Sequence, residues 1–288
     1  MNTLWNDIKI KMLHSGSRVN LLIGINVIVY LVVNIASVIE RLMFRSGAID
    51  YYTTEYLLLP SFLPKLLTHF WTPLTYMFMH AGIFHILFNM LWLYWMGQIF
   101  EEYLGNKRTI GLYILGGLTG ALFFVASYNI FPFFAGVVTG STVVGASASV
   151  MAIIIATATL LPDYSISLIL IGPVKLKWIA IFYVIIDFLS IAGPNAGGEF
   201  SHLGGALFGF IYIKQLQRGN DWIGAITGIF KSKSKLKAAS KNSERNSNGK
   251  PRQDEIDRIL DKISQTGYDS LNKQEKEILF RASKDNEG

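Results

Sequence analysis

The sequence has no cysteine among its 288 residues, and only 16% of its residues are charged. The absence of cysteine excludes disulfide bonds, thiolate nucleophiles and cysteine-ligated metal sites. The low charge content comes with 51% hydrophobic residues and a mean hydropathy of +0.37. That combination excludes an ordinary soluble domain and predicts a polytopic membrane protein.

Charge is missing altogether from two long stretches. Residues 19–39 form an uncharged run of 21 residues, and residues 109–162 form one of 54. A helix rises 1.5 Å per residue, so 21 residues can cross a hydrocarbon core of about 30 Å. A signal peptide would have a shorter apolar core and a small-residue cleavage site, so the first run is predicted to be a retained transmembrane helix.

Six transmembrane helices are predicted from these two runs and from three further apolar segments. Phe131, Pro132 and a glycine-rich stretch at 136–145 divide the long run into two helices. Residues 40–72 mix charged and aromatic groups with two prolines, which predicts a compact outer loop. The predicted spans are 19–39, 76–100, 110–129, 147–161, 177–192 and 202–216.

Basic residues lie beside the spans, at the N-terminus, at 107–108, at 175–177 and from 214 onward, whereas 130–145 has none. This distribution predicts that both termini are cytoplasmic, and we expect the inner membrane of a bacterium. The net charge of +6 raises the possibility of a nucleic-acid partner. Because the basic residues follow apolar spans rather than a soluble face, no nucleic-acid partner is expected.

Charge and periodicity predict four parts: a cytoplasmic segment 1–18, a membrane domain 19–216, a basic juxtamembrane linker 217–252 and a helical extension 253–288. Residues 231–252 carry eight basic residues and one glutamate among Ser, Asn and Gly. That composition predicts a disordered linker that binds anionic phospholipid. In the extension, apolar residues recur at helical spacing, and Asn272 begins an Asn-x-x-Glu capping pattern.

Polar residues inside the spans are costly in lipid and are functional candidates by default. His85 and Asn89 lie four apart and share a helical face, which His80 joins only if the helix begins after it. The sequence has no HExxH motif and no carboxylate at ligand spacing, so no metal or cofactor is expected. The alternative is that these residues make hydrogen bonds between helices.

The stretch VVGASASVMA, residues 143–152, begins the fourth predicted span. That span is too short to start at the membrane surface, so Ser147 would lie below the surface. Free backbone N–H groups and the positive end of the helix dipole would surround it there. Gly145 permits close approach of the chain or a positive φ angle. Ser149 lies about 200° from Ser147 around the helix and is predicted to face elsewhere. The alternative for both serines is simple close packing between helices.

His202 begins the sixth predicted span and shares a face with Gly205 and Gly209. Two small residues four apart allow a neighbouring helix to approach closely. If that neighbour is the fourth span, the imidazole of His202 can reach Ser147 at the outer ends of both helices.

Three motifs therefore occur in order: HAGIFHILFNM at 80–90, GAS at 145–147 and HLGGALFG at 202–209. Together they resemble the rhomboid family of intramembrane serine proteases, over roughly residues 20–215. The stretch EEYLGN after the second span is similar to the family's turn there. The resemblance implies an all-α, six-helix rhomboid-like membrane bundle, with the short helical extension following it.

The resemblance implies that Ser147 is the nucleophile and His202 its general base and acid, in a dyad without a third carboxylate. It implies an oxyanion hole formed by His85, Asn89 and the backbone N–H of Ser147, with His80 supporting near the entrance. The activity implied is serine endopeptidase cleavage of transmembrane proteins that enter from the lipid. The remaining supporting residues implied are Gly145, Gly205, Gly209 and, in a structural role, Glu101.

Two residues depart from the family pattern or lie outside it. The family usually has glycine after the nucleophile, and this chain has Ala148, whose methyl group could narrow the cavity or tilt the oxyanion N–H. Asp187 lies inside the fifth span, and the resemblance supplies no catalytic role for it. We interpret Asp187 as an interhelical hydrogen bond or a polar contact in the cytoplasmic half.

Two other functions compete with the protease. One is a catalytically impaired rhomboid-like protein that binds transmembrane segments without cleaving them. The other is a transporter with histidine and aspartate in a proton path, against which the chain lacks paired broken helices and matching halves.

Overall fold

The computed structural model describes residues 16–168, 171–229 and 253–284. The chain divides into two compact units, Met1–Ser232 and Lys233–Gly288, each of which is described by itself. Most of the predicted linker, residues 230–252, lies outside the described residues.

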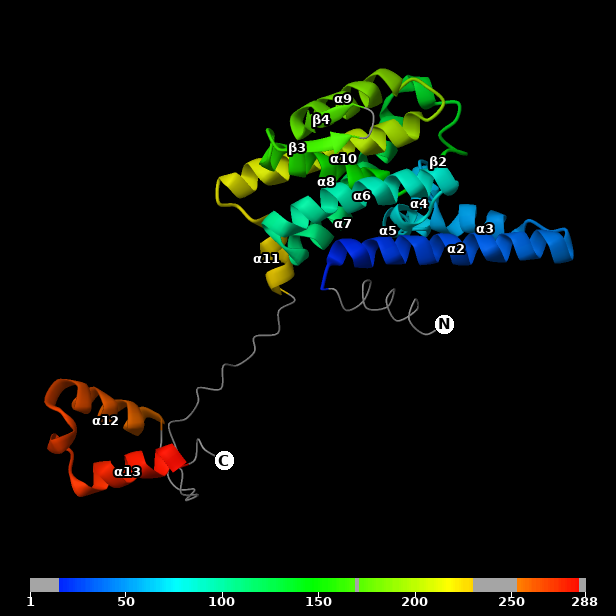
Figure 1. Cartoon of the computed structure of the whole chain (residues 1–288). Helices are drawn as coiled ribbons and strands as arrows, with labels where there is room; N and C mark the ends of the chain where they lie inside the picture. The colour runs from blue at the N-terminus through cyan, green and yellow to red at the C-terminus, as the bar shows by residue number, and fades with distance from the viewer. Residues whose placement is uncertain (1–15, 169–170, 230–252, 285–288) are drawn as a thin grey trace. The chain divides into compact units, whose positions relative to one another are not determined.

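The first unit is an all-α membrane bundle (Figure 1). By length and composition alone, α2, α6 and α7 can each cross a membrane, while α8 is apolar but shorter. The bundle helices are α2 (Arg18–Phe44), α6 (Ile83–Leu104), α7 (Asn106–Ile130), α8 (Ser147–Leu160), α9 (Leu176–Ser190) and α10 (Ala196–Gln217).

Helix α2 continues past the predicted end at residue 39, because the residues that follow are held by α3 (Ala48–Leu57). Both carboxylate oxygens of Glu40 accept hydrogen bonds from the first backbone N–H groups of α3, at Ala48 and Ile49. Arg41 pairs with Asp50 in the first turn of α3. The charged residues that predict a loop therefore lie inside the last turns of α2 and the first turn of α3, where Glu40 caps α3.

The region between α3 and α6 is built from short elements: β1 (Leu59–Pro60), α4 (Leu63–Thr68), α5 (Thr72–Thr75) and the 3₁₀ turn η2 (Tyr76–Phe78). Strand β1 pairs antiparallel with β2 (Thr142–Val143), which follows the turn η3 (Pro132–Phe134). Helix α6 begins at Ile83 rather than at the predicted residue 76, so His80 lies before the helix.

Helix α8 is the centre of the bundle, and most of its residues are buried against α6, α7 and α10. A Cβ atom at Gly205 would lie 2.0 Å from the Ala148 carbonyl oxygen, and one at Gly209 would lie 2.2 Å from that of Ala152. The prediction that the two glycines bring the sixth helix against the fourth is confirmed.

The hairpin of β3 (Ser165–Leu168) and β4 (Gly172–Lys175) leads into α9. Helix α9 buries Leu176, Ile179 and Asp187 and leaves most of its other side chains outward. Helix α10 begins at Ala196, so His202 lies in its second turn rather than at its start as predicted.

Helix α11 (Trp222–Ile229) lies within the stretch for which the sequence predicts only linker. Ile223 is buried against α7, where a Cβ atom at Gly111 would lie 2.2 Å from the Ile223 side chain. Arg108 of α7 pairs with Asp221 at 2.7 Å. The first unit therefore extends beyond the predicted boundary at residue 216.

The second unit consists of α12 (Gln253–Thr266), the turn η4 (Tyr268–Ser270) and α13 (Lys273–Lys284). Asn272 and Glu275 cap α13 reciprocally: each side chain accepts a hydrogen bond from the other's backbone N–H, at 2.9 and 2.8 Å. The predicted capping pattern is confirmed. Ile259 and Leu271 are buried between the two helices.

Candidate active site

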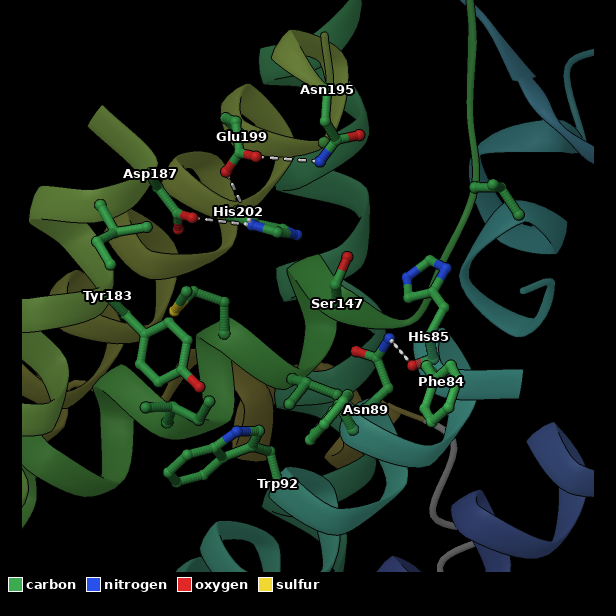
Figure 2. A pocket seen from close by; sticks show the side chains of 17 residues that line it. Phe84, His85, Asn89, Trp92, Ser147, Tyr183, Asp187, Asn195, Glu199 and His202 are labelled. Carbon is green, nitrogen blue, oxygen red and sulfur yellow. Dashed lines mark hydrogen bonds and ion pairs between the residues drawn. The ribbon is translucent and has the colours of Figure 1, made fainter. Parts of the chain in front are cut away.

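A cavity of about 470 Å³ lies between α6, α8, α9 and α10 (Figure 2). Trp92 of α6 and Tyr183 of α9 meet edge to face across it, with ring centroids 5.5 Å apart. Residues from all four helices point into it, namely Phe84, His85, Asn89, Trp92, Ser147, Tyr183, Asp187, Asn195, Glu199 and His202.

Ser147 is the first residue of α8 and lines the cavity. Ala146 at the N-cap makes no side-chain capping hydrogen bond, so the first turn keeps free N–H groups at the positive end of the helix dipole. Gly145, at φ +134°, has no room for a side chain, because a Cβ atom there would lie 2.8 Å from the His85 ring. The chain therefore reaches Ser147 through a turn that only glycine fits.

His85 and Asn89 face the same cavity from α6. The Asn89 side-chain amide donates to the His85 carbonyl oxygen at 2.9 Å. The Ala81 N–H donates to His85 Nδ1 at 3.4 Å, which leaves Nε2 as the protonated ring nitrogen. Both side chains can thus offer an N–H donor to an anion.

His80 does not line the cavity. Its ring is buried and packs edge to face on His85, with centroids 5.2 Å apart. Its contact with the described cavity is therefore through the His85 ring.

His202 lies between two carboxylates rather than in the carboxylate-free setting that the family resemblance implies. Its Nδ1 is 3.1 Å from Asp187 Oδ1 of α9 and 3.5 Å from Glu199 Oε2, one turn earlier on α10 (Figure 2). The Asn195 side-chain amide donates to Glu199 Oε1 at 3.0 Å.

Asp187 of α9 makes an interhelical hydrogen bond with His202 of α10, as the sequence suggests. Helix α9 runs from the β3–β4 hairpin toward the start of α10. Asp187 lies ten residues, about 15 Å along the helix, after Lys177, and this rise brings it beside His202.

Ser147 and His202 come together in this cavity from α8 and α10. Within the described residues, no hydrogen bond joins Ser147 Oγ to His202, and such contacts are often long before substrate binds. A hydroxyl beside an imidazole, with N–H donors from α6 and the α8 N-terminus, has the parts for acyl transfer.

Asp187, Glu199 and His202 also place ligand atoms within 4.8 Å of one another, a spacing that a divalent cation could use. The contacts of His202 Nδ1 with Asp187 and with Glu199 already account for the closeness of the three groups.

A rhomboid domain family matches residues 67–218, more than half of the chain. The chain belongs to the rhomboid family. Residues 239–285 match a second family, DUF6576, which is described as a family of unknown function.

Relatives of this rhomboid come from several kinds of organism. It is 30% identical over 140 residues to presenilin-associated rhomboid-like protein A, mitochondrial, of Danio rerio, covering 47% of this chain and 35% of the relative. It is 29% identical over 157 residues to RHOMBOID-like protein 12, mitochondrial, of Arabidopsis thaliana, covering 51% and 47%. Rhomboid protease GlpG of Salmonella newport is 36% identical over 55 residues, covering 19% and 20%. The matches therefore span less than half the length of these relatives.

Ala148, where rhomboids usually have glycine, does not point into the cavity. Its methyl group is buried against α7, 2.5 Å from where a Cβ atom at Gly120 would lie. The added methyl occupies the space left by that glycine, so it does not narrow the cavity. Ser149 also faces α7, beside Gly117, as predicted.

Sequence reasoning missed Glu199 and Asn195. Glu199 lies three residues before His202, which is a same-face spacing on a helix. The spacing alone could have found Glu199, had the helix been predicted to begin before it.

Proposed function

We propose that this rhomboid is an intramembrane serine endopeptidase that cleaves transmembrane proteins. The observation that carries the proposal is the convergence of Ser147, His202, His85 and Asn89 on one cavity inside the helical bundle. Ser147 is the nucleophile and His202 is the general base and acid. His85, Asn89 and the Ser147 backbone N–H are the oxyanion donors.

The proposed reaction is acyl transfer in two halves. Ser147 Oγ attacks the substrate carbonyl carbon while His202 Nε2 takes the hydroxyl proton, and the carbonyl electron pair moves onto an oxygen held by the donors of α6 and α8. The C–N bond then breaks, and His202 returns the proton to the leaving nitrogen. Water, activated by the same imidazole, releases the acyl group and regenerates Ser147.

The proposed supporting residues act through packing. Gly145 admits the His85 ring, and Gly205 and Gly209 bring α10 against the backbone of α8. Glu101 at the far end of α6 accepts hydrogen bonds from the Arg18 and Val19 N–H groups, which caps α2. His80 holds His85 in place.

We propose a bacterial cell membrane with both termini cytoplasmic, and substrates that enter sideways from the lipid. Basic groups at 107–108, at 175–177 and beyond 214 support this orientation. The mitochondrial names of two relatives make a mitochondrial membrane the competing location. Anionic phospholipid at residues 231–252 remains part of the proposal.

A serine-directed fluorophosphonate probe tests the function on purified protein. We expect the probe to label wild type and Ser149→Ala, and to label neither Ser147→Ala nor His202→Ala. Ser149 is the matched control because it lies on the same helix and faces α7. Absence of labelling in a folded wild type would support the non-catalytic, segment-binding alternative, and labelling that survives Ser147→Ala would overturn the choice of nucleophile.

A further inference from the structure

Two carboxylates from different helices meet at one nitrogen of His202. Asp187 and Glu199 both approach Nδ1, while the other ring nitrogen points into the cavity that Ser147 lines (Figure 2). A dyad that needed only serine and histidine would not need either acid there.

This contact selects the tautomer of His202. An ionised carboxylate accepts hydrogen bonds and cannot donate them, so the nitrogen facing it carries the proton. Protonated Nδ1 leaves a lone pair on Nε2, on the cavity side, where the proton of the Ser147 hydroxyl must be accepted.

Both acids are largely buried. The Asp187 side chain is 5% exposed and that of Glu199 is 13% exposed, so little water screens them from the imidazole. Asn195 fixes the second oxygen of Glu199, whereas no donor among the described residues contacts Asp187 Oδ2. The two carboxylates are thus mostly shielded from water, and both lie against His202 Nδ1.

We propose that Asp187 and Glu199 are positioning residues for His202: they hold its Nδ1 protonated and stabilise the imidazolium that forms when it accepts the Ser147 proton. This inference rests on the proposed protease function. Neither acid takes up a proton in the step, since the proton moves from Ser147 Oγ to His202 Nε2 and later to the leaving nitrogen. The acids stabilise a charge that exists only during the reaction, so their effect belongs to kcat.

The two acids are expected to share this effect. Replacing the single aspartate of a Ser-His-Asp site with asparagine lowers kcat by about 10⁴. Here one acid remains when the other is neutralised, so we expect Asp187→Asn or Glu199→Gln to lower kcat on the order of tenfold to a hundredfold. We expect the double variant to lose about 10³-fold or more, with KM changed less than threefold in all three.

The experiment measures kcat and KM for cleavage of a transmembrane substrate in liposomes, and the rate of fluorophosphonate labelling. EDTA is present throughout, so that no metal ion occupies the acid pair. Asp163→Asn is the matched control: it also converts a carboxylate to an amide, but at an exposed carboxylate that pairs with Lys175 and Lys177 at the start of α9. We expect Asp163→Asn to retain wild-type rates.

A second readout separates positioning from mere folding. In protein labelled with ¹⁵N-histidine, the His202 signals, assigned by their loss in His202→Gln, should show the Nδ1-protonated form in wild type and a mixture in the double variant. Asp187→Glu, which keeps an acceptor, should recover a large part of the rate lost in Asp187→Asn.

Each outcome bears on one proposal. Wild-type kcat in the folded double variant overturns the positioning role. A rise in KM confined to substrates with basic residues overturns it in favour of substrate recognition by the acids. A wild type that neither cleaves nor labels overturns the protease function instead.

Discussion

At the scale of single residues, the Asn89 amide is the simplest test of the proposed oxyanion hole. Losing one such donor costs about 10²–10³ in kcat in serine hydrolases. We expect Asn89→Ala to lower kcat by that factor and to leave KM nearly unchanged, measured with a transmembrane substrate in liposomes. Asn34→Ala is the control, because the Asn34 amide makes the same hydrogen bond, to the carbonyl four residues earlier, on exposed α2. Unchanged kcat in Asn89→Ala would remove Asn89 from the site.

Gly145 combines a left-handed backbone with a closed space. In Gly145→Ala, the new methyl would meet the His85 ring, and the positive φ angle adds about 1–2 kcal/mol of strain. We expect the labelling rate of Ser147 to fall at least tenfold, because His85 must move out of the cavity. Gly140→Ala is the control, since a Cβ atom at Gly140 meets no atom within 4 Å. Equal labelling of the two variants would contradict this account.

Some residues of the site can be predicted from the sequence, and others cannot. Ser147, His202, His85 and Asn89 stand in spaced motifs, and the spacing places each on a definite helical face. Asp187 could not be placed beside His202, because their contact depends on how α9 and α10 cross, which no spacing along either helix encodes. The direction of the Ala148 methyl likewise depends on Gly120, a residue of another helix.

At the scale of elements, the approach of α10 to α8 is the most sensitive contact in the bundle. In Gly205→Ala, the added methyl would overlap the Ala148 carbonyl, and such overpacking costs about 1–3 kcal/mol. We expect a lower unfolding temperature together with a loss of labelling, because α10 carries His202 and α8 carries Ser147. Gly47→Ala, at the open N-cap of α3, should show neither effect. A stable Gly205→Ala with full labelling would show that the two helices can separate without harm.

The cap of α13 predicts a pH effect in the second unit. Hydrogen bonds from the Asn272 N–H and from Lys262 hold the pKa of Glu275 below its ordinary value. A lowered folded-state pKa contributes stability that is present above the ordinary carboxyl pKa and is lost as pH falls through the lowered value. Protection factors of the first-turn amides of α13 should therefore fall on acidification below about pH 4.5.

Glu275→Gln provides the matched control for this cap. Glutamine still accepts the Asn272 N–H but does not titrate, so the pH dependence of those protection factors should disappear in the variant. Hydrogen exchange measured by mass spectrometry on the full chain checks both outcomes. A pH dependence that persists in Glu275→Gln would assign it to another group.

Hydropathy predicts where the six bundle helices lie better than it predicts where they begin and end. The predicted centres of all six spans lie within helices, because lipid requires long apolar segments. The ends were harder to predict: α2 is longer because Glu40 caps α3, and α10 starts earlier because polar Asn195 and Glu199 are used in the site. In both helices, polar or charged residues near the predicted end mark a partner in the fold rather than the end of the helix.

At the scale of the whole molecule, the first unit should function without the second. Its core is complete by Ile223, and the second unit buries its own residues, Ile259 and Leu271. We expect a chain that ends at residue 232 to label with fluorophosphonate at the wild-type rate and to unfold at the same temperature. A chain that ends at residue 219 should be less stable, because it loses Asp221, the partner of Arg108, and the buried Ile223. A shorter chain that labels slowly although folded would give the second unit a role in catalysis.

Helix α9 contributes one wall of the cavity, and its buried side chains are few, with Asp187 at the end nearest His202. An outward tilt of that end would part Tyr183 from Trp92 and would pull the Asp187 carboxylate away from the imidazole in the same movement. Entry of a bulky segment into the cavity and full basicity of His202 would then occur at different times. In the proposed protease, His202 is therefore least basic while the α9 wall of the cavity is open, and Ser147 attacks a peptide bond at the full rate only after that wall has closed.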